Sequence, residues 1–153
     1  LLQKAYRYDV KGKKYIDTPL KYYFTDIGLR NVRLGFRQQE ESHIMENIIY
    51  NELINRGYQV DVGMVSISEK NENDNYVRKQ LEVDFVCNLG YERIYIQSAL
   101  NIDEVEKKEQ EERSLIRIDD SFRKVIVVRN NIRKSVTLLQ NIKRKQRKNN
   151  RFT

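Results

Sequence analysis

The chain has 153 residues and a single cysteine, which is enough for one domain with a hydrophobic core but excludes an internal disulfide and a cysteine-based zinc site. Its densest apolar run, residues 125–128, is too short to cross a membrane, so we expect a cytoplasmic protein without membrane contact. A net charge of +7 is common in chains that bind nucleic acid, but six of the basic side chains lie in residues 143–151, and the remainder is nearly neutral.

The first segment, residues 1–20, has the pattern of a β-hairpin. Two tyrosine-rich runs flank a turn in which Gly12 can supply the positive φ. Pro19 is expected to break the second strand, and residues 21–24 then predict a short strand or extended segment. The chain begins with Leu-Leu rather than Met, so we expect it to be part of a longer protein, with this hairpin as the link to an upstream region.

Two helices are expected next. Asp26, with Thr25, can cap a short helix that ends near Gly35. Residues 40–56 predict a longer helix, which Gly57 ends as a C-cap. Its expected core-facing stripe consists of Ile44, Met45, Ile48, Ile49 and Leu53.

The second half of the chain predicts strands that surround one helix. The expected elements are strands at 58–67, 77–87 and 92–100, a polar hairpin loop at 68–76, a charged surface helix at 102–115 capped by Asp103, and a buried strand at 123–128. A helix before the last strand allows a parallel crossover. The order therefore predicts an α/β fold with a mixed central sheet flanked by helices.

Acidic and amide side chains lie inside the two strands that surround the turn at 88–91. Strand alternation predicts Glu82 and Asp84 on one face, with Val83 and Phe85 on the other. A hairpin can bring Asp84 beside Gln97 of the next strand. A carboxylate in a sheet needs a partner or a cation, so Mg²⁺ is one interpretation. Ordinary alternation with the acids facing solvent is the simpler one, and spacing alone favours it.

Four segments of this chain resemble one protein family. They are KYYFTDIGLRN at 21–31, HIMENIIYNELINRGY at 43–58, EVDFV at 82–86 and YIQ at 95–97. In this order they resemble the uncharacterised C-terminal domain of prokaryotic AAA-type (archaeal-type) ATPases, a PD-(D/E)XK nuclease-like domain. The resemblance implies a restriction-endonuclease-like core over residues 21–130. It also implies an upstream ATPase domain as partner, and ATP would bind only there because this chain has no phosphate-loop motif.

The resemblance also assigns site residues. Glu46 matches the acid of the first core helix, and Asp84 matches the acid of the second core strand. Gln97 stands at the Asp/Glu position of the third strand, and Ala99 stands at the lysine position. Active members bind Mg²⁺ through the acids and a backbone carbonyl, here that of Ser98. The missing acid and lysine imply weak or absent Mg²⁺ binding and a degenerate catalytic site.

Residues 131–153 predict a basic tail that is solvated or disordered. Basic side chains bind phosphates by releasing counterions, without sequence preference. The candidates for such nucleic-acid contacts are Lys143, Arg144, Lys145, Arg147 and Lys148. A solvated end is the more common role of a charge run like this one.

Three functions follow from these patterns. The leading one is a catalytically degenerate nuclease-like domain of an AAA-type ATPase that acts in DNA or partner recognition. The second is an active Mg²⁺-dependent DNA endonuclease with a rearranged site, which needs a lysine from elsewhere, such as Lys79. The third is a protein-interaction module that regulates the ATPase, which the near-neutral charge of residues 1–142 favours over strong DNA binding.

Overall fold

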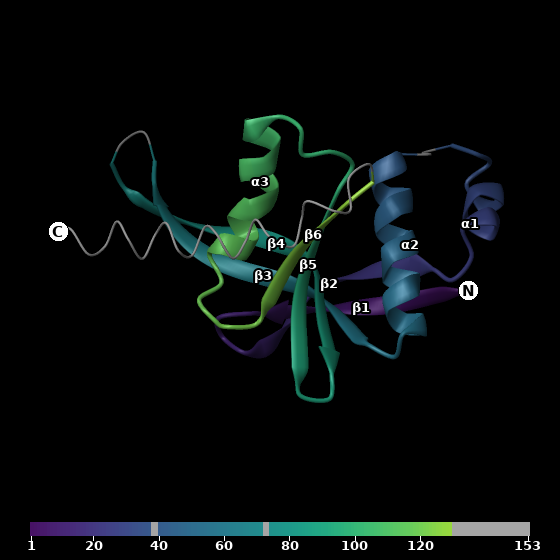
Figure 1. The fold of residues 1–153 in the computed structure, drawn as a ribbon, viewed down its shortest axis with the longest axis horizontal. Helices are drawn as coiled ribbons and strands as arrows, with labels where there is room; N and C mark the ends of the chain where they lie inside the picture. Colours follow the sequence, from purple (N-terminus) through teal and green to yellow (C-terminus); the bar gives the residue numbers. More distant parts are fainter. Residues whose placement is uncertain (38–39, 72–73, 130–153) are drawn as a thin grey trace.

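The computed structural model describes residues 1–37, 40–71 and 74–129. Its strands form one mixed sheet with the order β2-β1-β3-β4-β5-β6 (Figure 1). The basic tail and its five candidate nucleic-acid residues lie outside the described residues. The elements are β1 (Leu2–Asp9), β2 (Lys14–Phe24), α1 (Ile27–Arg33), α2 (Glu41–Asn55), β3 (Gln59–Lys70), β4 (Tyr76–Leu89), β5 (Glu92–Ala99), α3 (Val105–Ile116) and β6 (Arg123–Val128).

The strand directions confirm the mixed α/β class. Neighbours β3, β4 and β5 pair antiparallel, and β5 pairs parallel with β6 after the crossover through α3. Two hydrophobic cores lie on the two faces of this sheet. Leu115 of α3 belongs to one core, and Tyr50 and Leu53 of α2 belong to the other. The two faces are called the α3 side and the α2 side below.

The N-terminal hairpin is present, but two of its details differ from the prediction. The positive φ in its turn belongs to Lys13, at 52°, and not to Gly12. Pro19 does not end the strand, because β2 is an edge strand in which a missing N–H is tolerated, and the β1–β2 register shifts near this point. Since β1 also pairs parallel with β3, residues 1–20 are part of the same sheet as the core strands.

Helix α2 buries a different face from the one predicted. Its buried residues are Glu46, Asn47, Tyr50 and Leu53, whereas Ile48, expected in the core, has 53% of its surface exposed. The prediction of this apolar stripe is therefore wrong in part. The two polar residues can be buried because each has partners on β2, described below, and burial of a polar group is tolerated when it is paired.

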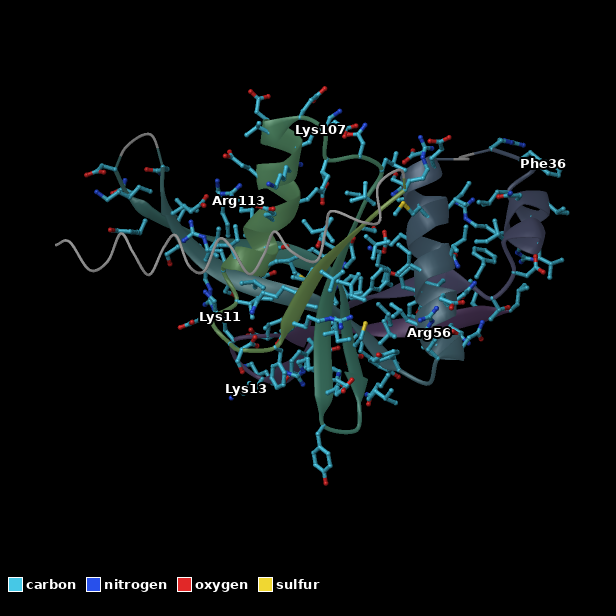
Figure 2. The ribbon with its side chains drawn as sticks, in the orientation of Figure 1. Lys11, Lys13, Phe36, Arg56, Lys107 and Arg113 are labelled. Carbon is cyan, nitrogen blue, oxygen red and sulfur yellow. The ribbon has the colours of Figure 1, made fainter. Side chains whose placement is uncertain are left out.

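The two long strands β3 and β4 extend into the segment expected to be a polar loop, which leaves only residues 71–75 as the connection. This β3–β4 hairpin projects from the body of the domain (Figure 1). Helix α3 begins after Glu104 rather than at the predicted cap Asp103. Its Lys107 and Arg113 project from the helix (Figure 2). Across the described residues, no helix is both long enough and apolar enough to span a membrane.

Candidate functional site

A β-bulge in β4 sets the position of Asp84. Two residues of β4, Asp84 and Phe85, lie opposite the single residue Val62 of β3, because the register between these strands shifts by one residue. The bulge interrupts the alternation of side chains, so Val83 packs on the α3 side and Phe85 on the α2 side. The expectation that Val83 and Phe85 share a face is therefore wrong.

Beyond the bulge, β4 and β5 separate, and the Asp84 carboxylate fills the gap. The β4–β5 pairing stops at Phe85 and Ile96. The Oδ2 atom of Asp84 then accepts hydrogen bonds from the backbone N–H and the hydroxyl of Ser98, both at 2.7 Å. The carboxylate thus acts as an acceptor for a backbone N–H that the neighbouring strand leaves unpaired.

The surroundings of Asp84 favour its neutral form. Burial raises the pKa of Asp84 to about 6, although the hydrogen bonds from Ser98 oppose this rise. The negative charge of Glu46 raises the pKa further, and the ammonium of Lys21 lowers it. Asp84 shares the α2 side of the sheet with Glu46, because it bonds to Ser98, which lies on that side of β5.

Lys21 of β2 lies between two carboxylates on the same side. Its Nζ atom is 2.6 Å from Oε1 of Glu46 and 3.0 Å from Oε1 of Glu82. The other oxygen of Glu82 is 2.6 Å from Nη1 of Arg7. Charges therefore alternate along Arg7, Glu82, Lys21 and Glu46, which come from four different elements. Burial opposes the ionised form of both Lys21 and Glu82. The two carboxylates nevertheless raise the pKa of Lys21. The neighbouring cations Arg7 and Lys21 lower the pKa of Glu82.

Contacts between α2 and β2 fix the position of Glu46. The Tyr23 hydroxyl donates a 2.5 Å hydrogen bond to Oε1 of Glu46, and its ring stacks on Tyr50 with centroids 4.0 Å apart. The Asn47 amide accepts from the N–H of Phe24 at 2.9 Å and donates to the carbonyl of Phe24 at 2.7 Å. This two-point contact ties the helix to the strand one residue from Glu46.

Strand β5 divides the remaining predicted site residues between the two sides of the sheet. Gln97 faces α3, where its Oε1 accepts from the Ser114 hydroxyl at 3.5 Å, and the same oxygen accepts from the backbone N–H of Asp84 at 3.3 Å. Ala99 is 6% exposed and packs in the α3-side core. Ser98 points to the α2 side. The fold thus places Glu46 and Asp84 on the α2 side of the sheet and the Gln97 side chain on the α3 side.

The donor set in this arrangement does not fit Mg²⁺, which needs several oxygen ligands about 2.0–2.1 Å away. Oε1 of Glu46 is taken by Lys21 and Tyr23, and Oδ2 of Asp84 is taken by Ser98. In the part of the chain that the structure describes, no group of three His, Cys, Asp or Glu side chains is placed to hold a metal ion. The proposed ligands Glu46, Asp84 and Ser98 therefore do not form a metal site as they stand.

A pocket of about 240 Å³ opens beside Glu46, between β2, α1 and α2. Its walls include the cationic side chains of Lys21 and Arg30, together with His43. A pocket of this size is smaller than a typical drug-sized site. Because the Glu46 carboxylate also lines it, this pocket is a small hollow of mixed charge on the α2 side of the site.

Lys21 and Arg7 are the site residues that sequence reasoning missed. The lysine suggested as a substitute, Lys79, lies on the exposed β3–β4 hairpin, where it pairs with Glu69 at 3.5 Å. Alternation along β2 would have shown that Lys21 and Tyr23 share a face. That this face meets Glu46 follows only from the long-range pairing of β1 with both β2 and β3.

The protonation of Asp84 should make the stability of the domain depend on pH. Its pKa is raised from 3.8 to about 6, so the folded state holds the proton more tightly than the unfolded state. As pH rises from about 4 to 7, wild type should lose on the order of 3 kcal/mol of stability relative to Asp84→Asn, with no further divergence above this range. Urea unfolding of both proteins at intervals of pH measures the difference. Parallel stability curves would contradict the prediction.

Comparisons with known proteins match the chain to part of a longer protein. Over 127 residues, which is 83% of this chain, it is 33% identical to an uncharacterized protein of Haemophilus influenzae. The chain spans 28% of the length of that relative. No family model matches the chain, and no solved structure matches it.

Proposed function

We propose that this is a nuclease-like domain that no longer cuts DNA and that serves recognition of DNA or a protein partner as the C-terminal part of an AAA-type ATPase. One observation carries the loss of catalysis. On the side where Glu46 and Asp84 lie, the part of β5 beside Asp84 presents Ile96 and Ser98, and so contributes neither an acid nor a lysine there.

The order of the elements supports a restriction-endonuclease-like core. Helix α2 leads into three antiparallel strands, and α3 then leads into a strand parallel to the third. Glu46 on this helix and Asp84 on the second of these strands occupy the positions that the family resemblance assigns to the acids. The bulge at Asp84 agrees with this view, because bulges are frequent beside functional sites.

The chemistry explains why this site should be inactive. Hydrolysis of a phosphodiester needs an oriented nucleophile and stabilisation of the developing charge on phosphate. Each such group is typically worth about 10² to 10⁴ in rate, so the loss of both an acid and a lysine leaves little catalysis. A site without catalysis can still serve recognition, because binding does not need the lost groups.

A second candidate function is an active Mg²⁺-dependent DNA endonuclease with a rearranged site. Lys21 favours it, because this ammonium lies within 3.0 Å of two carboxylate oxygens although it comes from a different strand than the family motif. In such an enzyme Lys21 would take over the role of the motif lysine.

A cleavage assay separates these two functions. Plasmid DNA is incubated with the full chain and Mg²⁺ or Mn²⁺, beside Asp84→Ala, Lys21→Met and the exposed control Asp74→Ala. We expect no cleavage above background in any sample. Cleavage by wild type and the control that disappears in both site variants would replace the recognition function with the active endonuclease.

Recognition itself is tested by DNA binding at increasing salt. Fluorescence anisotropy is measured for the full chain and for a variant with the five candidate tail residues replaced by glutamine. Binding that survives in the variant supports DNA recognition by the folded domain, and a reduced salt dependence reports the contribution of the tail. If neither protein binds DNA, partner recognition is the remaining form of the proposed function.

A further inference from the structure

We infer that Lys21 is the built-in cation of an acidic cluster formed by Glu46, Glu82 and Asp84. Its ammonium stands where a divalent cation would bind, so the wild-type cluster rejects such ions, and removal of this ammonium creates a metal site. This inference concerns metal binding, and it is tested without DNA.

The positions of the charges support a cation at this point. Two carboxylate oxygens, from Glu46 and Glu82, lie 2.6 Å and 3.0 Å from the same Nζ atom. Two ionised carboxylates do not share a point in a partly buried site unless a positive charge lies between them. The third carboxylate, Asp84, lies two residues from Glu82 along β4 and bonds to Ser98 on the α2 side of the sheet.

The charge balance explains why a second cation is not needed. Three carboxylates, from Glu46, Glu82 and Asp84, face two cations, Arg7 and Lys21, which leaves one net negative charge. A divalent ion entering this cluster would be repelled by the ammonium and would have to displace it from both oxygens. Without Lys21 the net charge becomes −2. Oε1 of Glu82 then loses its ammonium partner, and Oε1 of Glu46 keeps only the hydrogen bond from Tyr23.

The strand that carries Lys21 keeps the ammonium in place. Lys21 lies in β2, where its neighbour Tyr23, on the same face, donates to the same oxygen of Glu46. The Lys21 side chain is about one-quarter exposed. The ammonium is therefore a fixed part of the site rather than a mobile surface charge.

The test is a titration of the full chain with Mn²⁺ alone, followed by electron paramagnetic resonance of the free ion at pH 7.5. Wild type, Lys21→Met and Lys21→Arg are compared with Lys79→Met, which removes a lysine from the exposed hairpin. Lys21→Met should bind one Mn²⁺ at least about tenfold more tightly than the other three proteins. The double variant Lys21→Met/Glu46→Gln should lose this gain.

Thermal unfolding gives a second readout. Lys21→Met should melt several degrees below wild type without metal, because two carboxylates lose their shared partner. Mn²⁺ should restore its melting temperature, whereas NaCl at the same ionic strength should not. If this variant is unfolded without metal, recovery of its circular dichroism spectrum on addition of Mn²⁺ replaces the melting temperature.

Three results would overturn the inference. The first is wild-type Mn²⁺ binding as tight as that of Lys21→Met and sensitive to Glu46→Gln. The second is a folded Lys21→Met that gains no affinity, and the third is an unfolded one that Mn²⁺ does not restore. None of these results depends on DNA cleavage, so this inference and the proposed function can fail separately.

Discussion

Replacement of Ala99 by lysine, the residue of the family motif, is expected to destabilise the domain by about 3–5 kcal/mol without producing nuclease activity. Ala99 is 6% exposed and packs in the α3-side core, so a lysine there would bury an unpaired ammonium. Its direction would also be wrong, because Glu46 and Asp84 lie on the α2 side. Urea unfolding gives the loss of stability, and a plasmid assay with Mg²⁺ tests for activity.

The control for this experiment is Ala99→Met, which adds similar volume without a charge. Overpacking alone should cost about 1–3 kcal/mol, so the difference between the two variants isolates the buried charge. If Ala99→Lys were as stable as wild type and cut DNA, the side of the sheet that we assign to Ala99 would be wrong.

Removal of the Phe85 side chain should cost about 3–5 kcal/mol of stability in Phe85→Ala. Phe85 is fully buried, and its ring centroid lies 6.1 Å from that of Tyr23 and 6.4 Å from that of Tyr50. Since Tyr23 also holds Glu46, the cavity left by Phe85 would open directly beneath the site. Chemical denaturation with urea measures the change in the free energy of unfolding.

Tyr91→Ala is the matched control for this second variant. Tyr91 is fully exposed in the β4–β5 turn, and its removal should change stability by less than about 0.5 kcal/mol. A loss below about 1 kcal/mol in Phe85→Ala would mean that the bulge does not turn this ring into the α2-side core.

The alternating charges of the site explain how a small domain keeps three carboxylates and an amide near the centre of its sheet. Lys21 and Arg7 pair with Glu46 and Glu82, and Ser98 bonds to Asp84. Paired in this way, the acids need no solvent-facing surface and no metal ion to be tolerated. The simpler sequence interpretation, acids that face water, therefore does not describe Asp84, which is buried.

The sequence by itself determined the elements whose signals are local. The last strand at 123–128 has the bounds that were predicted, and Asp26 caps α1 through a 2.8 Å bond from the N–H of Leu29. Gly57, with a φ of 85°, ends α2 as expected. A cap, a turn glycine or an apolar run depends on a few neighbouring residues, so it can be read without knowledge of the rest of the chain.

Only the tertiary structure decided which side chains meet in the site. A one-residue bulge separates Val83 from Phe85, and the strand pairing brings Lys21 to Glu46 across 25 positions of sequence. Neither leaves a local signal, because a register shift moves side chains between faces without any change in composition. For this reason the acids of the site could be predicted, while the cation between them could not.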